Sequence, residues 1–318
     1  MFVKLSKFIS KIDFHLGAFV KAALVTTNGW VYFSEYLPSE AIIISIGDGI
    51  GNQLFKYAFG ISIAKQLSKN CIVDIIPFQG DMEYQRSYKL EFLGIKTEQL
   101  LFDVNEESLI KYFAFFHYLK LINRLIPFYL RIYVDENDIK RLEIHHQKSS
   151  IRKCVYFSGY WQNKDYISSY SYKIIQSQIL EKCSISTNAS KWLAKIENRA
   201  SVAVHIRQTK FNPRLQPSYY IQAYDLIKKI IPDAKFYIFA DDWEWAENNL
   251  PFLSSSELVK GNNDIDDFYL LLYSRNTIIA NSTFSWWAAY LKPYEQSIII
   301  YPKLLDPKLE IVDKWIKV

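Results

Sequence analysis

The stretch SVAVHIRQTKF, residues 201–211, is the part of the sequence that decides the fold. Apolar residues alternate from Val202 to Ile206 on one face of a predicted strand, whereas His205 and Arg207 lie on the other face. Side chains two positions apart on a strand point the same way, so His205 and Arg207 can reach one ligand just beyond it. Open α/β sheets bind ligands at the carboxyl ends of their strands. The stretch therefore predicts an α/β fold with a ligand site at that edge.

Two later stretches repeat this design. The predicted strand Lys235–Ala240 is followed by Asp241 and Asp242, and the predicted strand Thr277–Ala280 leads into the start of a helix. If the strands are parallel, the polar residues after them share one crevice with the imidazole and the guanidinium described above. A cation, two carboxylates and a helix N-terminus suit a nucleotide diphosphate. The polar residues after the third strand are Asn281, Ser282 and Thr283.

Composition bounds the class of protein. The chain has 318 residues, half of them hydrophobic, which favours two domains that each bury a core. The net charge of +5 is spread along the chain, so it suits anionic small ligands and argues against dedicated nucleic-acid binding. Cys71, Cys154 and Cys183 have no metal-binding spacing, which favours a reducing compartment and hence the cytoplasm.

Residues 1–40 form a basic amphipathic extension. Apolar residues from Leu5 to Phe19 recur on one helical face, while Lys4, Lys7 and Lys11 lie on another. The stretch has no clean apolar run followed by a cleavage site, and we find no transmembrane segment. We expect the extension to pack against the protein or to attach it peripherally to the inner face of the membrane.

A βαβ unit opens the first domain, residues 41–160. The glycine-rich turn GDGIGNQ differs from the dinucleotide fingerprint, which needs a glycine where Asn52 stands, although Asp74 occupies about the place of the ribose-binding acid. A nicotinamide-dependent oxidoreductase therefore stays open as an alternative. The predicted elements are a strand at 41–46, the turn at 47–53, a helix at 54–69 and a strand at 71–75.

Asp264 and Asp266 form a DxD pattern, which holds a divalent metal in many sugar transferases. The pair directly precedes a helix that we predict to begin near Phe268. Acids before a helix usually cap it, so we interpret Asp266 or Asp267 as the N-cap and expect no metal site.

Five sequence blocks in order resemble the α-1,2-fucosyltransferases of glycosyltransferase family eleven, bacterial type. The resemblance covers about Ile42 to Leu291. The blocks are GDGIGNQLFKYAFG, SGYWQNKDY, VHIRQTKF, FADDWEW and IIANSTFSWWAAYL.

The resemblance implies a GT-B-like protein with two Rossmann-like domains facing across a cleft. Residues 41–160 would be the acceptor-side domain and residues 161–318 the domain that binds GDP-L-fucose. It also implies a metal-independent, inverting transfer to the 2-hydroxyl of a β-galactoside. The acceptor would be a galactose-containing oligosaccharide or lipid-linked glycan of surface-polysaccharide (O-antigen) synthesis.

The resemblance also implies roles for individual residues. Arg207 would bind the diphosphate, and His205 with the Asp241 and Asp242 pair would hold the nucleoside. The loop from Asn281 to Ser285, with Ser282 and Thr283 between them, would cradle phosphate, and Asn52 would face the donor. A guanidinium and a helix N-terminus suit this chemistry, since negative charge builds on the departing GDP.

Two departures from the family pattern affect catalysis. Where the family has a second arginine, a spacer and an acid, this chain has Gln208, Thr209 and Lys210, and Asp48 replaces the first glycine of the turn. Either Asp48 acts as the base, or the reaction is dissociative and the leaving phosphate accepts the proton. We favour the second. Gln208 and Lys210 also keep open a catalytically weak relative that only binds nucleotide sugars or glycans.

Overall fold

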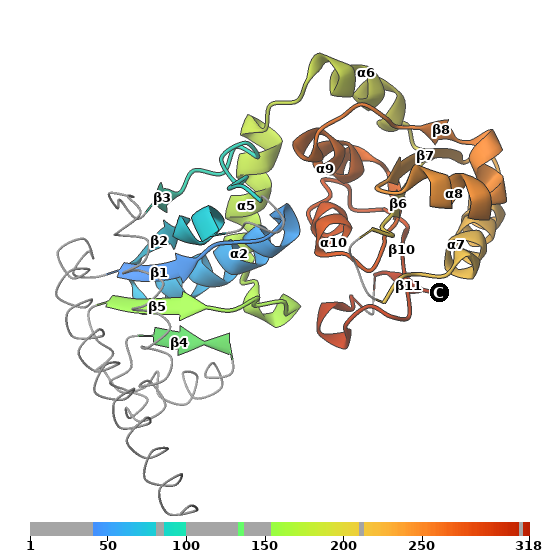
Figure 1. The fold of residues 1–318 in the computed structure, drawn as a ribbon. Coiled ribbons are helices and arrows are strands. Elements are labelled where there is room, and N and C mark those ends of the chain that lie inside the picture. Colours follow the sequence, from blue (N-terminus) through green and yellow to red (C-terminus); the bar gives the residue numbers. More distant parts are fainter. Residues whose placement is uncertain (1–40, 81–85, 100–132, 137–153, 210–212, 312–313) are drawn as a thin grey trace, which may run out of the picture. The chain divides into compact units, whose positions relative to one another are not determined.

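The computed structural model describes residues 41–80, 86–99, 133–136, 154–209, 213–311 and 314–318. These residues form two compact α/β units, each built around its own parallel sheet (Figure 1). The predicted α/β class with two Rossmann-like units is confirmed. The predicted extension at 1–40 and Lys210 lie outside the described residues.

The first unit comprises 41–46, 63–80, 97–99, 133–136 and 154–160 of the described chain. Its sheet has the order β3-β2-β1-β5-β4, and every pairing is parallel. The central strand β1 places Ile43 opposite Ile72 of β2 and Tyr156 of β5. The strands are β1 Ala41–Ser45, β2 Asn70–Asp74, β3 Glu98–Gln99, β4 Tyr133–Asp135 and β5 Cys154–Ser158, and a 3-10 turn spans Ile76–Gly80.

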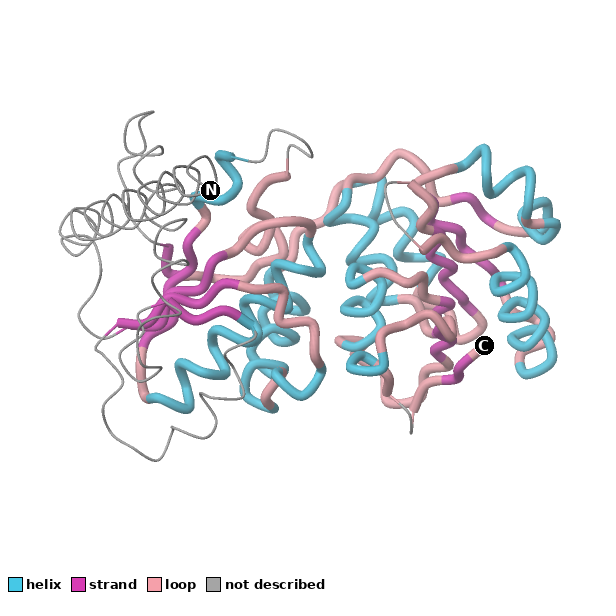
Figure 2. The backbone as a smooth tube through the Cα atoms, turned by 60° about the horizontal axis from the view of Figure 1, so that its bottom comes forward, coloured by secondary structure: helices cyan, strands magenta, loops and turns pink. Residues whose placement is uncertain are grey.

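The second unit comprises the remaining described residues, and its sheet has the order β11-β10-β9-β6-β7-β8. Helices cover both faces of this sheet, with α9 and α10 on one side and α7 and α8 on the other (Figures 1 and 2). The strands are β6 Ser201–Ile206, β7 Lys235–Ala240, β8 Glu257–Leu258, β9 Asn276–Ile278, β10 Ile299–Tyr301 and β11 Ile316–Lys317. The helices after α2 are α5 Ser169–Lys182, α6 Thr187–Ile196, α7 Pro217–Ile230, α8 Trp243–Asn249, α9 Asp264–Tyr273 and α10 Thr283–Tyr290, with 3-10 turns at Lys164–Tyr166, Pro251–Ser255 and Pro307–Leu309.

The alternation predicted for β6 is confirmed. Val202, Val204 and Ile206 are buried in one apolar core with residues of α7. His205 faces the other way, and its ring lies 5.5 Å from that of Phe284 in α10. Polar residues of one strand face therefore lie against the start of a helix.

Helix α2 (Ile50–Leu67) begins four residues earlier than the sequence predicts and absorbs most of the expected glycine-rich turn. Its residues up to Ser62 belong to the second unit. The reason is aromatic packing: the ring of Phe55 lies 4.9 Å from that of Trp286 and 5.0 Å from that of Trp287. Both tryptophans are fully buried, so the WW pair serves the core. Most of the stretch predicted as a glycine-rich turn is therefore the first part of a packed helix.

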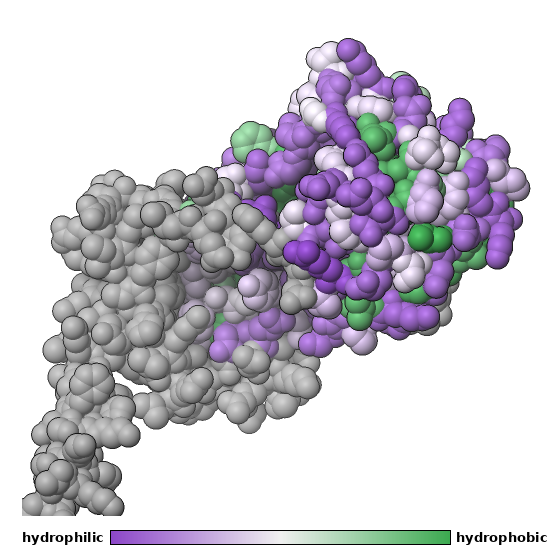
Figure 3. Space-filling model, turned by 45° about the vertical axis from the view of Figure 1, so that its right-hand side comes forward, coloured by the Kyte–Doolittle hydropathy of each residue, from purple (hydrophilic) through white to green (hydrophobic). Residues whose placement is uncertain are grey.

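The surface of the second unit in the view of Figure 3 is mostly hydrophilic, with apolar residues in small separate spots. The large apolar side chains that are exposed come from separate parts of the described chain. No helix among the described residues has the length and apolar character needed to cross a bilayer. The exposed side chains are those of Phe92, Tyr160, Tyr170, Ile230 and Leu304.

Candidate functional site

Three strand ends supply the predicted site, and the structure brings them together. In the second unit β9, β6 and β7 are parallel neighbours, so the residues that follow them lie at one edge of the sheet. The residues are His205 with Arg207 after β6, Asp241 with Asp242 after β7, and the start of α10 after β9. The prediction that these three segments meet at one edge is confirmed.

Asp241 is occupied by the loop after β6. Its carboxylate lies 3.0 Å from Arg207 Nη1. It also accepts hydrogen bonds from the backbone N–H of Gln208 at 2.7 Å, and from both the backbone N–H and the hydroxyl of Thr209 at 3.2 and 2.6 Å. One carboxylate thus fixes the path of three successive residues and holds the guanidinium that they carry. Asp241 acts on Arg207, and the nucleoside contact that we expected of it stays a prediction.

Asp242 caps the helix that follows it. One carboxylate oxygen, Oδ1, accepts from the backbone N–H of Trp245 at 2.9 Å, as an N-cap residue does. Its other oxygen has no hydrogen bond to a described residue. Of the two aspartates, Asp242 is therefore the one whose carboxylate retains an acceptor for a ligand.

His205 is neutral at physiological pH. Burial, with the Arg207 guanidinium beside it, lowers the pKa of His205 to about 4, although the Asp241 carboxylate acts in the opposite direction. Its Nδ1 is buried and has no hydrogen-bond partner among the described residues. A buried polar atom of this kind normally finds a partner, which a ligand can supply.

The start of α10 carries hydroxyl groups and no acid in its first turn. Ser282 is the N-cap and accepts from the backbone N–H of Phe284 at 3.3 Å, while the hydroxyl of Ser285 is turned toward the carbonyl of Ser282 at 3.4 Å. Asn281 precedes the cap and is partly exposed. The unpaired N–H groups of a helix start and its dipole favour an anion here.

The start of α2 meets the start of α10. A Cβ on Gly51 would lie 2.4 Å from the carbonyl carbon of Thr283 and 2.6 Å from the backbone nitrogen of Phe284, so only glycine fits. Gly49, by contrast, has nothing within 4 Å of such an atom. Neither helix has an acid in its first turn, so the two partial positive charges are not neutralised from within these turns. Two helix starts that converge in this way favour an anionic ligand.

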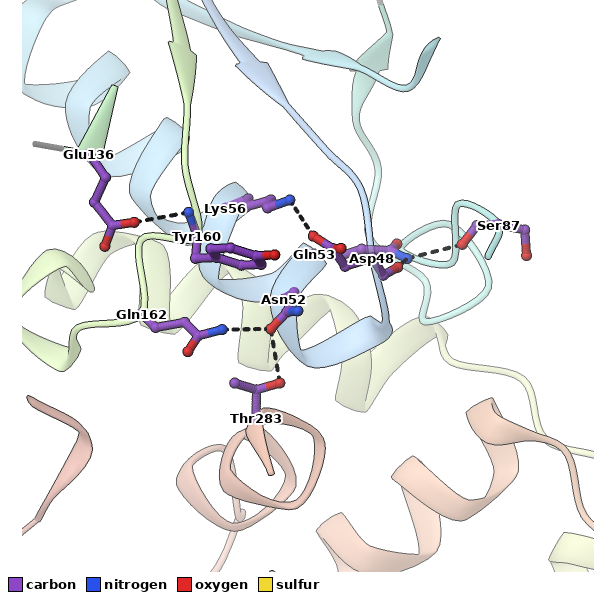
Figure 4. Close-up of polar contacts among 9 residues, drawn as sticks. All are labelled: Asp48, Asn52, Gln53, Lys56, Ser87, Glu136, Tyr160, Gln162 and Thr283. Carbon is purple, nitrogen blue, oxygen red and sulfur yellow. Dashed lines mark hydrogen bonds and ion pairs between the residues drawn. The ribbon is translucent and has the colours of Figure 1, made fainter. Parts of the chain in front are cut away.

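Asn52 lies at this meeting point. Its Oδ1 accepts hydrogen bonds from Gln162 Nε2 at 2.9 Å and from Thr283 Oγ1 at 3.1 Å (Figure 4). All three residues belong to the second unit.

Asp48 is engaged in an ion pair. It adopts a left-handed backbone conformation, with φ +68°. Its carboxylate lies 2.7 Å from Nζ of Lys56 in α2 (Figure 4). Gln53 Nε2 donates a hydrogen bond to the backbone carbonyl oxygen of Asp48 at 2.8 Å. The ion pair holds one of the two carboxylate oxygens of Asp48, Oδ2, toward Lys56. This geometry weighs against Asp48 as the base.

The DxD acids face protein groups, and the cap prediction for them is wrong. Helix α9 begins at Asp264 rather than near Phe268, and its N-cap is Asn263, because a neutral amide there accepts two backbone N–H groups. The acids in the first turn then interact favourably with the positive end of the helix dipole. Asp264 pairs with Lys89 at 3.3 Å, Asp266 accepts from the Ser186 backbone at 2.9 Å, and Asp267 accepts from Asn262 at 3.1 Å. Among the described residues, no group of three or more acidic, histidine or cysteine side chains is placed to hold a metal ion.

Comparison with known proteins decides the family. The family model described as "Glycosyl transferase family 11" matches residues 41–314. The chain belongs to glycosyl transferase family 11. The nicotinamide oxidoreductase alternative is therefore wrong, and Asp74 is in any case fully buried, where it accepts from the Tyr156 hydroxyl at 2.5 Å.

Two curated relatives of this glycosyltransferase come from Escherichia coli. The alpha-1,2-colitosyltransferase is 26% identical over 298 residues, which cover 87% of this chain and 98% of the relative. The O-antigen biosynthesis glycosyltransferase WbnK is 25% identical over 283 residues, which cover 81% of this chain and 92% of the relative.

Solved structures of low sequence identity also align with this glycosyltransferase. Fucosyltransferase NodZ from Bradyrhizobium is 12% identical, with a TM-score of 0.46, and the alignment covers 81% of this chain and 95% of the NodZ chain. POFUT1 in complex with GDP-fucose is 11% identical, with a TM-score of 0.49, and the alignment covers 83% of this chain and 99% of the POFUT1 chain.

The candidate site contains residues that the sequence analysis did not single out. Gln162 and Lys56 each bind a predicted site residue directly. Gln208 is buried, donates to the Leu215 carbonyl at 2.9 Å, and keeps a buried Oε1 without a partner among the described residues. Gln162 lies within a block that marked the family, which was the one signal that could have indicated it.

Proposed function

We propose that this glycosyltransferase transfers L-fucose from GDP-L-fucose to the 2-hydroxyl of a β-galactoside, with inversion and without a metal ion. The acceptor is a galactose-containing oligosaccharide or lipid-linked glycan in the synthesis of O-antigen. The observation that carries this proposal is the meeting of two helix starts that have no acid in their first turns, α2 at Gly51 and α10 at Thr283. An anion belongs there, and the diphosphate of a nucleotide sugar is one.

Arg207 and the start of α10 stabilise the leaving group in this proposal. Breaking the bond between sugar and diphosphate builds negative charge on GDP, and a guanidinium already held by Asp241 needs little reorganisation to meet that charge. The backbone N–H groups at the start of α10, with the side chain of Asn281, contact the phosphates in this proposal. A neutral His205 offers a hydrogen bond without adding a charge.

Asp242 recognises the guanine of GDP in this proposal. Guanine presents N1–H and a 2-amino group, and both need an acceptor. The carboxylate oxygen that does not cap α8 is suited to this contact. Asp241 is assigned a supporting part, because its oxygens already bind Arg207, Gln208 and Thr209.

The reaction we propose is dissociative, and the leaving phosphate accepts the acceptor's proton. The ion pair between Asp48 and Lys56 favours this route over a base at Asp48. The acids at the start of α9 are also occupied by protein groups, which favours transfer without a metal.

Colitose is a second candidate for the transferred sugar, because a curated relative is a colitosyltransferase. Colitose is L-fucose without its 3-hydroxyl. A site that hydrogen-bonds a hydroxyl rejects the analogue that lacks it far more strongly than a site that does not.

The test is transfer to a β-galactoside from GDP-L-fucose and from the corresponding colitose donor, with the linkage determined by NMR. We expect an α-1,2-fucosylated product and faster transfer from the fucose donor. Faster transfer from the colitose donor would reassign the sugar. GDP binding by calorimetry without product from either donor would indicate a relative that only binds nucleotide sugars.

A further inference from the structure

We infer that Gln162 and Thr283 are positioning residues that fix the amide of Asn52 so that its N–H groups face the donor's diphosphate. The inference rests on the proposed function and adds the orientation of one side chain to it. It comes from three segments of the second unit: the start of α2, the segment after Trp161, and the start of α10.

The two hydrogen bonds at Asn52 share one atom. Gln162 Nε2 and Thr283 Oγ1 both converge on Oδ1, at 2.9 and 3.1 Å (Figure 4). A carbonyl oxygen has two lone pairs, so these bonds use its full capacity as an acceptor. The amide is thereby held with its oxygen toward the protein.

The Nδ2 group of Asn52 is left with its donors. It makes no hydrogen bond to a described residue, and the side chain is partly exposed. An amide nitrogen has two N–H groups and no acceptor capacity. Asn52 can therefore donate to a phosphate oxygen, and it cannot take a proton from the acceptor hydroxyl.

The surrounding backbone requires this arrangement. Gly51 brings α2 so close to Thr283 that a single added carbon would clash at 2.4 Å, which keeps the Thr283 hydroxyl within reach of Asn52. The donors of Asn52 thus add to those of two helix starts, where a developing negative charge is best met by fixed N–H groups. Gln162 and Thr283 act through Asn52.

A double-mutant cycle with GDP as the probe tests this. Replacing Asn52 by Ala should weaken GDP binding about ten- to a hundredfold, as expected for hydrogen bonds to a charged group, and Gln162→Met should weaken it about three- to tenfold. In the Asn52→Ala background, Gln162→Met should have no further effect, because its target is gone. Thr283→Ser, which keeps the hydroxyl, should bind GDP more tightly than Thr283→Val.

Two further comparisons sharpen the test. Asn52→Asp keeps both accepted bonds, so it should unfold at a higher temperature than Asn52→Ala and yet bind GDP less tightly. Gln178→Met is the matched control, since Gln178 lies on α5 and accepts from the Lys96 backbone at 3.1 Å; its GDP affinity should equal that of the wild type.

The following outcomes would overturn the inference. One is a Gln162→Met effect that persists in the Asn52→Ala background, because Gln162 would then contact the ligand itself. Another is tighter GDP binding by Asn52→Asp than by Asn52→Ala. Failure of the wild type to bind GDP would overturn this inference and the diphosphate site together. Binding of GDP without fucose transfer would overturn only the proposed reaction.

Discussion

The helices α9 and α10 of the second unit differ in the charge of their first turns. The start of α9 has an asparagine cap and three first-turn acids, and each acid faces a group of the protein. Burial raises the pKa of one of them, Asp267, to about 6. The start of α10 has no acid in its first turn, and it borders on the start of α2, whose first turn also has none. The protein supplies acids of its own to the first turn of α9 and none to that of α10, where we propose that an anion binds.

The largest effect should come from Arg207. We expect Arg207→Ala to lower transfer at least a hundredfold with the fold intact, because a charge-assisted bidentate contact is worth about 1.5 to 3 kcal/mol and more where charge develops. Arg207→Lys should restore little, because the planar fork is lost. Turnover and circular dichroism of the three proteins check this. Wild-type turnover by the alanine variant would remove Arg207 from the site.

His205 should make the α10 region sensitive to acid. Its pKa is about 4 in the folded protein and about 6.5 in an unfolded chain, so the unfolded chain binds the proton first as pH falls. Stability is therefore complete above about pH 6.5 and declines down to about pH 4, by about 3 kcal/mol. Urea unfolding at pH 7 and pH 5 measures this. An equal decline in His205→Asn would assign it to other groups.

Asn281→Asp would place an acid just before the N-cap of α10, near a helix start whose first turn has none. A carboxylate near a helix start favours the fold by about 0.3 to 1 kcal/mol, so the unfolding temperature should hold or rise. GDP affinity should fall about tenfold, because the added charge repels the diphosphate. Asn281→Ala separates the lost amide from the added charge. Unchanged GDP affinity in both variants would place the diphosphate elsewhere.

Asp48→Asn should be mild. A lost general base costs roughly 10² to 10⁴ in the chemical step, whereas we expect less than tenfold because Asp48 pairs with Lys56. Single-turnover rates across pH measure this. Asp48→Asn and Lys56→Gln should lower the unfolding temperature by similar amounts, because each breaks the same ion pair. The double variant should lower it by less than the sum of the two. A hundredfold loss in the single-turnover rate with unchanged GDP affinity, together with loss of the acidic limb from the pH–rate profile, would identify Asp48 as the base.

The smallest effect should come from the start of α9. Asp264→Asn removes only a partly exposed ion pair with Lys89, which is worth about 0 to 1 kcal/mol. Transfer should continue in this variant, and in the wild type with excess chelator. Loss of activity in EDTA with recovery on adding manganese would show that a metal is needed and return attention to these acids.

The sequence predicted the parts of this site that depend on periodicity. The alternation in β6 and the polar residues after β7 and β9 placed three strand ends at one edge, because parallel strands share their direction. The resemblance added the family, which the family model confirms.

Side-chain partners were beyond the sequence, because they depend on how backbone segments meet. Asp241 and Asp242 are adjacent and chemically identical, yet one binds the loop after β6 and the other caps α8. Asn263 rather than an aspartate caps α9, since several polar residues there suit the position equally. The early start of α2 follows from Phe55 packing on residues far along the chain.

The contact between Asn52 and Thr283 also has a consequence for the order in which the protein is made. The two residues are separated by 231 positions, and Asn52 and Gln162 by 110. A ribosome synthesises about 5 to 20 residues per second, so Asn52 waits many seconds for its last partner. Contacts of such long range also form slowly, because they close large loops. The proposed donor site is therefore among the last features to form, and a nascent chain that stops before α10 has every strand from β1 to β9 without the contact between Asn52 and Thr283.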